Sequence, residues 1–407
     1  MAPAVRAPLP GGCPAGRERA VRRGGEGRAR RHGGDRVATY AHLAPEHLEL
    51  LHRAEQLAQD ELDPIAREGE PGRINRPLVR ALGEQGLLGR VLDHDVPALE
   101  LCLIREGLAR HCTEAETAFA VQGLGAHPIL ANGGPDLVAD WLPRVARGEA
   151  IAGFALTEPG AGSDVAALKL RAERDGNDFR LTGEKTYISN APDADLYSVF
   201  ARTSERGLTA FAVPRASEGL TGASLSLLSP HPIGRLVFDG VPVPADHVLG
   251  DVDQGFKVAM QTLDLFRPSV GAFAVGMAQA ALDVAVTHVT TREAFGGTLS
   301  RLQGVSHQLA EVATSVQAAR LLVHSAASAY DRGIRPTTKA AAMAKLFATE
   351  TAQRAIDVAI QVHGARALET GHPLEHLYRE VRATRIYEGA SEVQREVIAR
   401  QLFRAVE

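Results

Sequence analysis

The chain has 407 residues, of which 45% are hydrophobic and 23% are charged, and its formal net charge at pH 7 is −4. This composition is ordinary for a globular protein of two to four domains, and the bulk charge argues against a nucleic-acid binder. No stretch approaches the ~20 unbroken apolar residues of a membrane helix. The three cysteines, Cys13, Cys102 and Cys112, fit neither a disulfide framework nor a metal site, so a reducing, cytoplasmic compartment is expected.

The N-terminal segment differs in composition from the rest of the chain. Residues 1–36 contain nine arginines and no lysine against three acidic residues, and they are rich in glycine and proline. This composition is typical of disorder, so residues 1–42 are predicted to be an unstructured extension. The alternative is a basic arm that binds nucleic acid or a protein partner.

Helical patterning begins near residue 43 and continues to residue 150. Apolar residues recur at spacings of three and four in LAPEHLELLHRAEQLAQDELDPIAREGE, and further helical segments read RPLVRALGEQGLL, ALELCLIREGLARH, AETAFAVQGLGAHPIL and PDLVADWLPRVARGE. Residues 43–150 are therefore predicted to form an all-α domain.

The pattern then changes to short alternating segments and turn signals. Residues 169–185, KLRAERDGNDFRLTGEK, predict a hairpin around Asp175–Asn177, and LYSVFART, LTAFAVPR and GRLVFDGVPVP predict further strands. Residues 151–250 are therefore predicted to form a β domain.

Helical patterning returns and continues to the C-terminus. Three long helical segments and a terminal one predict a four-helix bundle over residues 251–407, with a kink or a helix start near Arg267 because Pro268 follows it. The predicted fold class is thus α+β, mainly α, with an N-terminal helical domain, a middle β domain and a C-terminal bundle.

Residues 154–164, FALTEPGAGSD, follow a short predicted strand. Their glycines would let the backbone approach a ligand, and Thr157 and Ser163 offer hydroxyl groups. The alternative is that these residues form only a β-turn that ends in an Asx-type turn at Asp164.

Glu388 stands between Tyr387 and Gly389, just before Ser391, which could cap the terminal helix. A carboxylate in an apolar setting has a raised pKa and can act as a base. A solvated turn glutamate is the alternative.

Two further groups of polar residues have weaker signals. Arg292 and Gln303 stand at the ends of two consecutive helices, where an arginine can bind phosphate or cap helix carbonyls. His372 and His376 have metal-ligand spacing but lack the HExxH order, and no metal site is predicted.

Five segments in this order, FALTEPGAGSD, TGEKTYISNA, TREAFGG, QVHGARAL and IYEGASEVQ, resemble the acyl-CoA dehydrogenase family over roughly residues 43–407. The resemblance implies the same helical, β and helical domain order. It also implies FAD, held between the β domain and the C-terminal bundle.

The resemblance assigns cofactor-binding residues to three places. The flavin would contact Phe154, Leu156, Thr157, Ser163, Tyr187, Ile188 and Ser189, and the turn at Gly389 and Ser391 would close over it. The rest of FAD would be reached from a neighbouring subunit by Arg292, Phe295, Gln303, Gln361 and Gly364, which implies a homotetramer built as a dimer of dimers.

The family places its catalytic base at one of two positions. Phe266 occupies one of them and cannot accept a proton, so the resemblance assigns the base to Glu388. The matching substrate-binding residues are Ser163, Asp264, Arg267, Tyr387 and Arg400.

The resemblance implies α,β-dehydrogenation of an acyl-CoA or acyl-carrier-protein thioester, with electrons passed to an electron-transferring flavoprotein. A short GLLGRVLDHDVPALE segment in place of the usual loop indicates a small, branched or cyclic acyl group, and no arginine stands near Thr117 to favour a dicarboxylic one. The alternatives are an acyl-ACP dehydrogenase of specialised metabolism, an acyl-CoA oxidase, a flavin monooxygenase, and a nucleic-acid-associated flavoprotein that uses the basic arm.

Overall fold

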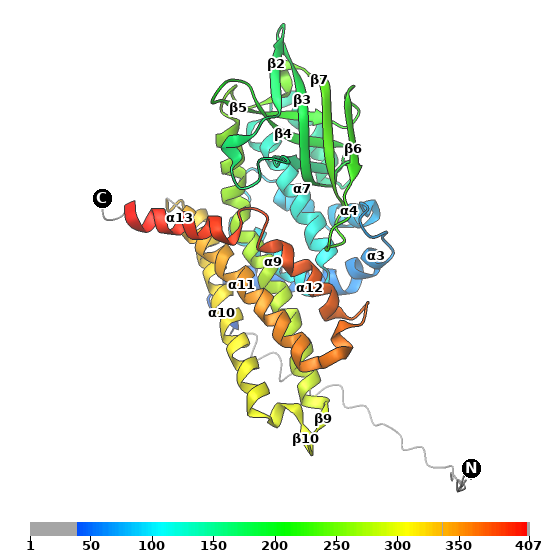
Figure 1. The fold of residues 1–407 in the computed structure, drawn as a ribbon, viewed down its shortest axis with the longest axis vertical. Helices are drawn as coiled ribbons and strands as arrows, with labels where there is room; N and C mark the ends of the chain where they lie inside the picture. Colours follow the sequence, from blue (N-terminus) through cyan, green and yellow to red (C-terminus); the bar gives the residue numbers. More distant parts are fainter. Residues whose placement is uncertain (1–38, 336, 405–407) are drawn as a thin grey trace, which may run out of the picture. The chain divides into compact units, whose positions relative to one another are not determined.

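The computed structural model describes residues 39–335 and 337–404 (Figure 1). The predicted unstructured extension falls largely on residues 1–38 and lies outside the described residues. Residues 39–44 belong to a separate unit and form a turn in which the Leu43 N–H donates to the Tyr40 carbonyl (2.9 Å). All further elements belong to the unit Pro45–Glu407.

The first part of this unit is helical. Its helices are α2 (Pro45–Leu57), the π-turn η1 (Ala58–Leu62), α3 (Asp63–Arg67), α4 (Arg76–Glu84), α5 (Leu87–Val91), α6 (Ala98–His111), α7 (Thr113–Asn132) and α8 (Pro135–Ala146). Local signals set their ends: the Asn75 side chain accepts a hydrogen bond from the Leu78 N–H (3.0 Å) at the start of α4, where Pro77 is tolerated. Helix α6 is buried over most of its length.

The middle part is a mixed sheet. Its elements are β1 (Ala152–Ala155), the 3₁₀ turn η2 (Val165–Ala167), β2 (Arg171–Asp175), β3 (Asp178–Ser189), β4 (Leu196–Arg202), β5 (Leu208–Pro214), β6 (Leu220–Ser224), β7 (Ile233–Val243), η3 (Ala245–His247) and β8 (Val248–Leu249). The strand order is β6-β7-β3-β2-β4-β5-β8, and β1 pairs in parallel with β4. The predicted hairpin is confirmed: β2 and β3 are antiparallel, with Gly176 at φ +65° in the turn.

The last part is helical again. It contains α9 (Gly255–Thr291), the hairpin β9 (Glu293–Ala294) and β10 (Gly297–Thr298), η4 (Leu299–Arg301), α10 (Gln303–Asp331), α11 (Thr338–His363), η5 (Gly364–Leu368), α12 (Pro373–Thr384) and α13 (Ser391–Arg404). Helix α9 continues through Pro268, so the predicted helix start near Arg267 is wrong. Buried residues on several sides of α9 hold this helix in the core, and packing compensates for the hydrogen bond that proline removes.

Helix α9 connects the sheet to the far end of the bundle. At its start Gly255 lies against β5, where an added Cβ would come within 2.6 Å of the Thr209 carbonyl carbon. Along its length it packs on α6, α7, α10 and α11. Among the described residues α9 is also the one helix with the length and composition of a membrane span, but 61% of its most apolar window is buried inside the protein, as in a core helix.

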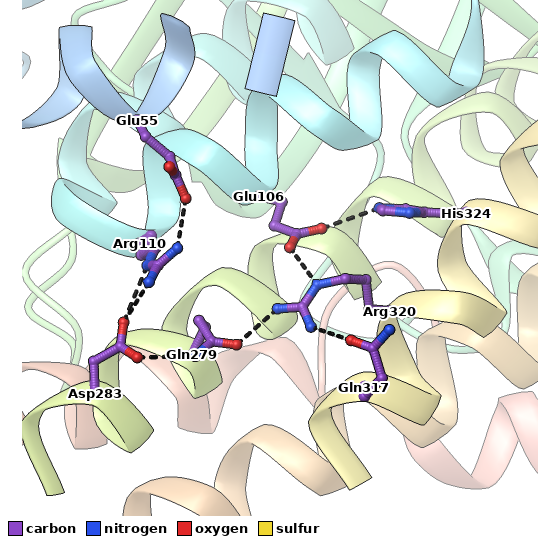
Figure 2. A network of polar contacts seen from close by, with 8 residues as sticks. All are labelled: Glu55, Glu106, Arg110, Gln279, Asp283, Gln317, Arg320 and His324. Carbon is purple, nitrogen blue, oxygen red and sulfur yellow. Dashed lines mark hydrogen bonds and ion pairs between the residues drawn. The ribbon is translucent and has the colours of Figure 1, made fainter. Parts of the chain in front are cut away.

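A network of buried charges joins α2 and α6 to α9 and α10 (Figure 2). Arg110 pairs with Glu55 and with Asp283, each at 2.6 Å. Arg320 pairs with Glu106 at 2.7 Å, and His324 lies 3.1 Å from the same carboxylate. Burial alone would raise the pKa of Glu106, but Arg320 and His324 outweigh it and hold that pKa well below its usual range.

Replacement of Arg320 by methionine should lower the free energy of unfolding by about 3–5 kcal/mol, because Glu106 would be left buried without this cation. Since the pKa of Glu106 is lowered in the fold, its stabilising effect is present above the unfolded value and is lost as the pH falls. Urea unfolding at pH 7 and pH 4 should therefore show a smaller difference between the two proteins in acid. Arg354→Met, which breaks an exposed pair with Glu311, is the control and should change stability by less than about 0.5 kcal/mol. Equal effects of the two substitutions would contradict the importance of the network.

Candidate active site

The two segments predicted to hold a flavin lie side by side at the ends of β1 and β3. The Thr186 N–H donates to the Thr157 carbonyl (2.9 Å), and the Lys185 ammonium donates to the Leu156 carbonyl (2.8 Å). Two segments that are thirty residues apart in the sequence thus form one surface. Phe154 lies in β1 and packs on Phe200, with ring centroids 4.9 Å apart.

A buried ion pair fixes this arrangement, and sequence reasoning missed it. Lys185 is completely buried and lies 2.8 Å from Glu158, which also accepts hydrogen bonds from the backbone N–H groups of Lys169 (2.6 Å) and Leu170 (2.9 Å). Burial lowers the pKa of Lys185 to about 8, and the Glu158 carboxylate opposes that shift. The alternation of β3 gave the only signal, since it places Lys185 at a position where the chain is buried.

The glycine-rich segment does contain a turn, but the predicted Asx-type turn at Asp164 is wrong. Glu158 and Ala161 exchange two backbone hydrogen bonds of 3.1 Å, and the Asp164 side chain caps nothing. Gly160 and Gly162 have open space where a Cβ would stand, and Ser163 is exposed. The segment therefore presents a small, open backbone surface.

Side chains on the β3 segment have contrasting exposures. Tyr187 has φ +56° and is 61% exposed, whereas the Ile188 side chain is buried and leaves only its backbone for a ligand. Ser189 is half-buried at the end of the strand. An exposed aromatic ring in a left-handed backbone conformation is costly unless a partner covers it.

Glu388 lies on the turn between α12 and α13, with φ +50°. Its Oε2 atom is buried and has no hydrogen-bond partner among the described residues. Burial raises the pKa of the Glu388 carboxyl, and Arg105, Arg267 and Lys345 oppose that shift. The alternative of a solvated turn glutamate is therefore wrong.

The neighbours of Glu388 include charged residues that sequence reasoning did not find. Arg105 on α6 is buried, pairs with Glu116 on α7 and donates to the Ser269 hydroxyl (2.6 Å). Burial raises the pKa of Tyr387 well above its usual value, and the Glu116 carboxylate adds to that shift. No sequence motif could indicate these residues, since α6 and α7 contribute them from nearly three hundred residues away.

Residues assigned to the substrate have different surroundings. Arg267 pairs with Asp264 at 2.9 Å, and its Nε is buried without a partner among the described residues. Arg400 lies on α13 in an exposed pair with Glu396, and within the described residues it forms no ion pair with Glu388. The Ser391 hydroxyl donates to Glu350 (2.7 Å) instead of capping α13, because that carboxylate lies opposite the turn.

The remaining cofactor residues lie at the other end of α9 (Figure 1). They follow that helix, start α10 or end α11, and they are Arg292, Phe295, Gln303, Gln361 and Gly364. Since α9 has 37 residues, its two ends are about 55 Å apart, and this group cannot contact the β1–β3 surface of the same chain. Phe295 is 91% exposed at φ +53°, again an uncovered aromatic ring.

The histidines have structural contacts. His372 accepts a hydrogen bond from the Leu374 N–H at the start of α12, and His376 lies 2.7 Å from the Thr113 hydroxyl. The His363 Nδ1 atom lies 2.7 Å from the Ala359 carbonyl oxygen, and the His363 ring stacks on that of His288. In the part of the chain that the structure describes, no cluster of three or more histidine, cysteine, aspartate or glutamate side chains could hold a metal ion.

The assigned residues fit a flavin nucleotide. Among residues 39–335 and 337–404, no side-chain hydrogen bond occupies Thr157 or Arg292, and two strained turns expose the Tyr187 and Phe295 rings. A hydroxyl and an aromatic ring suit the isoalloxazine, and an arginine suits the phosphates. Their separation also fits a cofactor shared between two subunits.

Comparisons with known proteins agree with this geometry. Residues 44–149, 153–241 and 253–403 match the N-terminal, middle and C-terminal domains of acyl-CoA dehydrogenase. The mitochondrial short-chain specific acyl-CoA dehydrogenase of Bos taurus is 37% identical over 377 residues, which cover 89% of this chain and 91% of that protein. Cyclohexane-1-carbonyl-CoA dehydrogenase of Geobacter metallireducens is 35% identical over 362 residues, covering 86% and 95%.

A solved structure shows the same fold. The butyryl-CoA dehydrogenase of Megasphaera elsdenii matches with a TM-score of 0.83 and 31% identity, over 89% of this chain and 99% of that one. The chain therefore belongs to the acyl-CoA dehydrogenase family, whose members are FAD-dependent oxidoreductases that act on the CH–CH group of an acyl-CoA.

Proposed function

We propose that this enzyme converts an acyl-CoA to its 2,3-enoyl thioester, with Glu388 as the base that removes the α proton. The observation that carries the proposal is the buried Glu388 Oε2, which has no partner among the described residues and belongs to a carboxyl whose pKa is raised. A base of this kind holds its proton more firmly than a solvated glutamate and is therefore better matched to a weak carbon acid.

The Glu388 backbone supports the same role. Its N–H has no acceptor among the described residues, although the adjacent Tyr387 N–H donates to Ala383 (3.2 Å). Such a free donor suits the thioester carbonyl oxygen, on which negative charge develops as the α proton leaves. The α proton goes to the Glu388 carboxylate, and the Cα–Cβ double bond forms as hydride leaves Cβ. Bound FAD supplies the hydride acceptor, its N5 atom.

The buried Arg105–Glu116 pair near Tyr387 favours a small acyl group. A long apolar chain laid against these charged groups would gain few apolar contacts and would offer the charges no hydrogen bond. The names of the relatives, a short-chain enzyme and a cyclohexane-1-carbonyl enzyme, support the same choice. CoA is proposed as the carrier, electron-transferring flavoprotein as the electron acceptor, a dimer of dimers as the assembly and the cytoplasm as the compartment.

Replacement of Glu388 by glutamine should leave yellow, FAD-bound protein whose anaerobic bleaching by substrate slows by about 10²–10⁴-fold, because the base is lost. Stopped-flow absorbance of the flavin measures this rate. Glu392→Gln, at an exposed position four residues along, is the matched control and should bleach like the wild type. A wild-type rate in the Glu388→Gln protein would rule out the assignment.

The rate should also depend on pH in a defined direction. Since burial raises the pKa of Glu388, kcat/KM should fall as the pH decreases through a midpoint above 4.5, the ordinary glutamate value. A midpoint at or below that value would contradict the raised pKa.

A panel of thioesters should distinguish the substrates. Butyryl-CoA and cyclohexane-1-carbonyl-CoA should bleach the flavin faster than palmitoyl-CoA, and faster than the same acyl groups on acyl carrier protein. Faster bleaching by palmitoyl-CoA would contradict the role of the Arg105–Glu116 pair, whereas faster bleaching by acyl carrier protein would favour the acyl-ACP alternative. Oxygen consumption without an added acceptor would favour an oxidase.

Sharing of the cofactor between subunits can be tested by mixing inactive proteins. A Glu388→Gln protein keeps Arg292 and Phe295, and an Arg292→Ala/Phe295→Ala protein keeps Glu388. If a neighbouring subunit supplies Arg292 and Phe295, co-expression of the two variants should restore activity. The active sites would combine Glu388 from one subunit with Arg292 and Phe295 from the other. Continued inactivity of the purified mixed oligomers would show that each site is built from one chain.

A further inference from the structure

Lys345 is a charged residue on an apolar helix face. It lies in α11 beside Ala341, Ala344 and Ala348, all buried against the core, and it is itself completely buried. Burial of an ammonium is strongly unfavourable unless polar partners compensate it. A lysine at this position therefore needs a reason other than packing.

The one hydrogen bond of the Lys345 ammonium in the described chain reaches the turn that carries Glu388. Its Nζ donates to the Gly389 carbonyl at 2.7 Å. The Gln394 side-chain amide, buried in α13, donates to the same oxygen at 3.0 Å. Two donors from two helices thus hold one carbonyl.

The turn needs such support. Glu388 has φ +50° and Gly389 has φ +95°, both in the left-handed region. A Cβ on Gly389 would come within 2.2 Å of the Gln394 amide nitrogen and would displace that amide, and the φ of +95° itself favours glycine. A non-glycine residue in this conformation persists where its surroundings over-determine it.

Lys345 also differs from the other cations that face Glu388. Arg105 from α6 is paired with Glu116, and Arg267 from α9 is paired with Asp264. Within residues 39–335 and 337–404, no carboxylate forms an ion pair with Lys345, although Glu388, Glu350 and Glu392 attract its charge and Arg267 repels it. Of these three cations, Lys345 is therefore the one that has no ion-pair partner in the described part of the chain.

We propose that Lys345 is a positioning residue of the reaction: its ammonium, anchored on the Gly389 carbonyl, fixes the turn that carries Glu388 and stabilises the negative charge of that carboxylate. This inference rests on the proposed function of Glu388. Burial lowers the pKa of Lys345 to about 8, so the lysine keeps its charge at neutral pH.

Two substitutions separate the hydrogen bond from the charge. Lys345→Gln keeps a donor toward the Gly389 carbonyl and removes the charge, and Lys345→Met removes both. In the FAD-bound protein, both should move the acidic limb of the kcat/KM profile up by about one pH unit, because Glu388 loses a facing cation. Lys345→Met should also lower kcat by about tenfold, since the turn loses a support, whereas Lys345→Gln should lower it less. Lys339→Met, on the same helix, is the control and should leave the profile unchanged.

The outcomes are distinguishable. An unmoved acidic limb in Lys345→Gln overturns the role of the charge. If both Lys345 variants fail to give folded, FAD-bound protein, the residue is structural and the proposal is overturned. A fully active Glu388→Gln protein overturns this proposal and the proposed function together, whereas an inactive Glu388→Gln protein with an unmoved limb in Lys345→Gln overturns this proposal alone.

Discussion

Helix α9 is apolar on most sides, and this one constraint organises the rest of the molecule. A helix of this kind has to be covered all round, and α6, α7, α10 and α11 pack on it from both flanking parts of the sequence. The N-terminal and C-terminal helices therefore share one core, although they are separated by a sheet of about a hundred residues. The start of α9 rests on β5, which fixes the sheet against that core.

Buried charges in this core fall into two kinds. In the network of Figure 2, Glu106 and Arg110 are each held by partners from other helices, and such pairs fix how α6 lies against α9 and α10. Near Glu388 the compensation is incomplete, because one carboxyl oxygen has no partner among the described residues. Complete pairing suits a structural contact, whereas a group that must take up a proton has to keep an oxygen available.

The turn at Glu388 shows the same division of roles at the level of the backbone. Its left-handed residues are held by Lys345, which stands 44 residues from Gly389 on α11, and by Gln394 in the first turn of α13. The helical scaffold thus bears the conformational cost, and the Glu388 Oε2 atom has no hydrogen-bond partner among the described residues.

Periodicity and turn signals were sufficient to predict the order of helical, β and helical segments, and they located the hairpin at Gly176 because such signals act over a few residues. Five short motifs were sufficient to predict the family, and the same motifs single out Glu388, whose role as the base is a proposal. The predicted helix start near Arg267 was wrong, because tertiary packing keeps α9 continuous through Pro268. The predicted Ser391 cap was also wrong, because the Ser391 hydroxyl binds Glu350 instead of the helix end.

The surroundings of Glu388 could not be predicted from the sequence. Arg105 and Lys345 come to Glu388 from helices hundreds or tens of residues away, and Glu116 comes with Arg105 as its ion-pair partner. Each of them looks in the sequence like an ordinary residue of a helix. The sequence by itself determined which elements form and, through its motifs, the family and the carboxylate that we propose as the base, because those signals are local. Only the tertiary structure decided which charges face that carboxylate and which are already paired, because the energy of a buried charge depends on neighbours that only packing brings together.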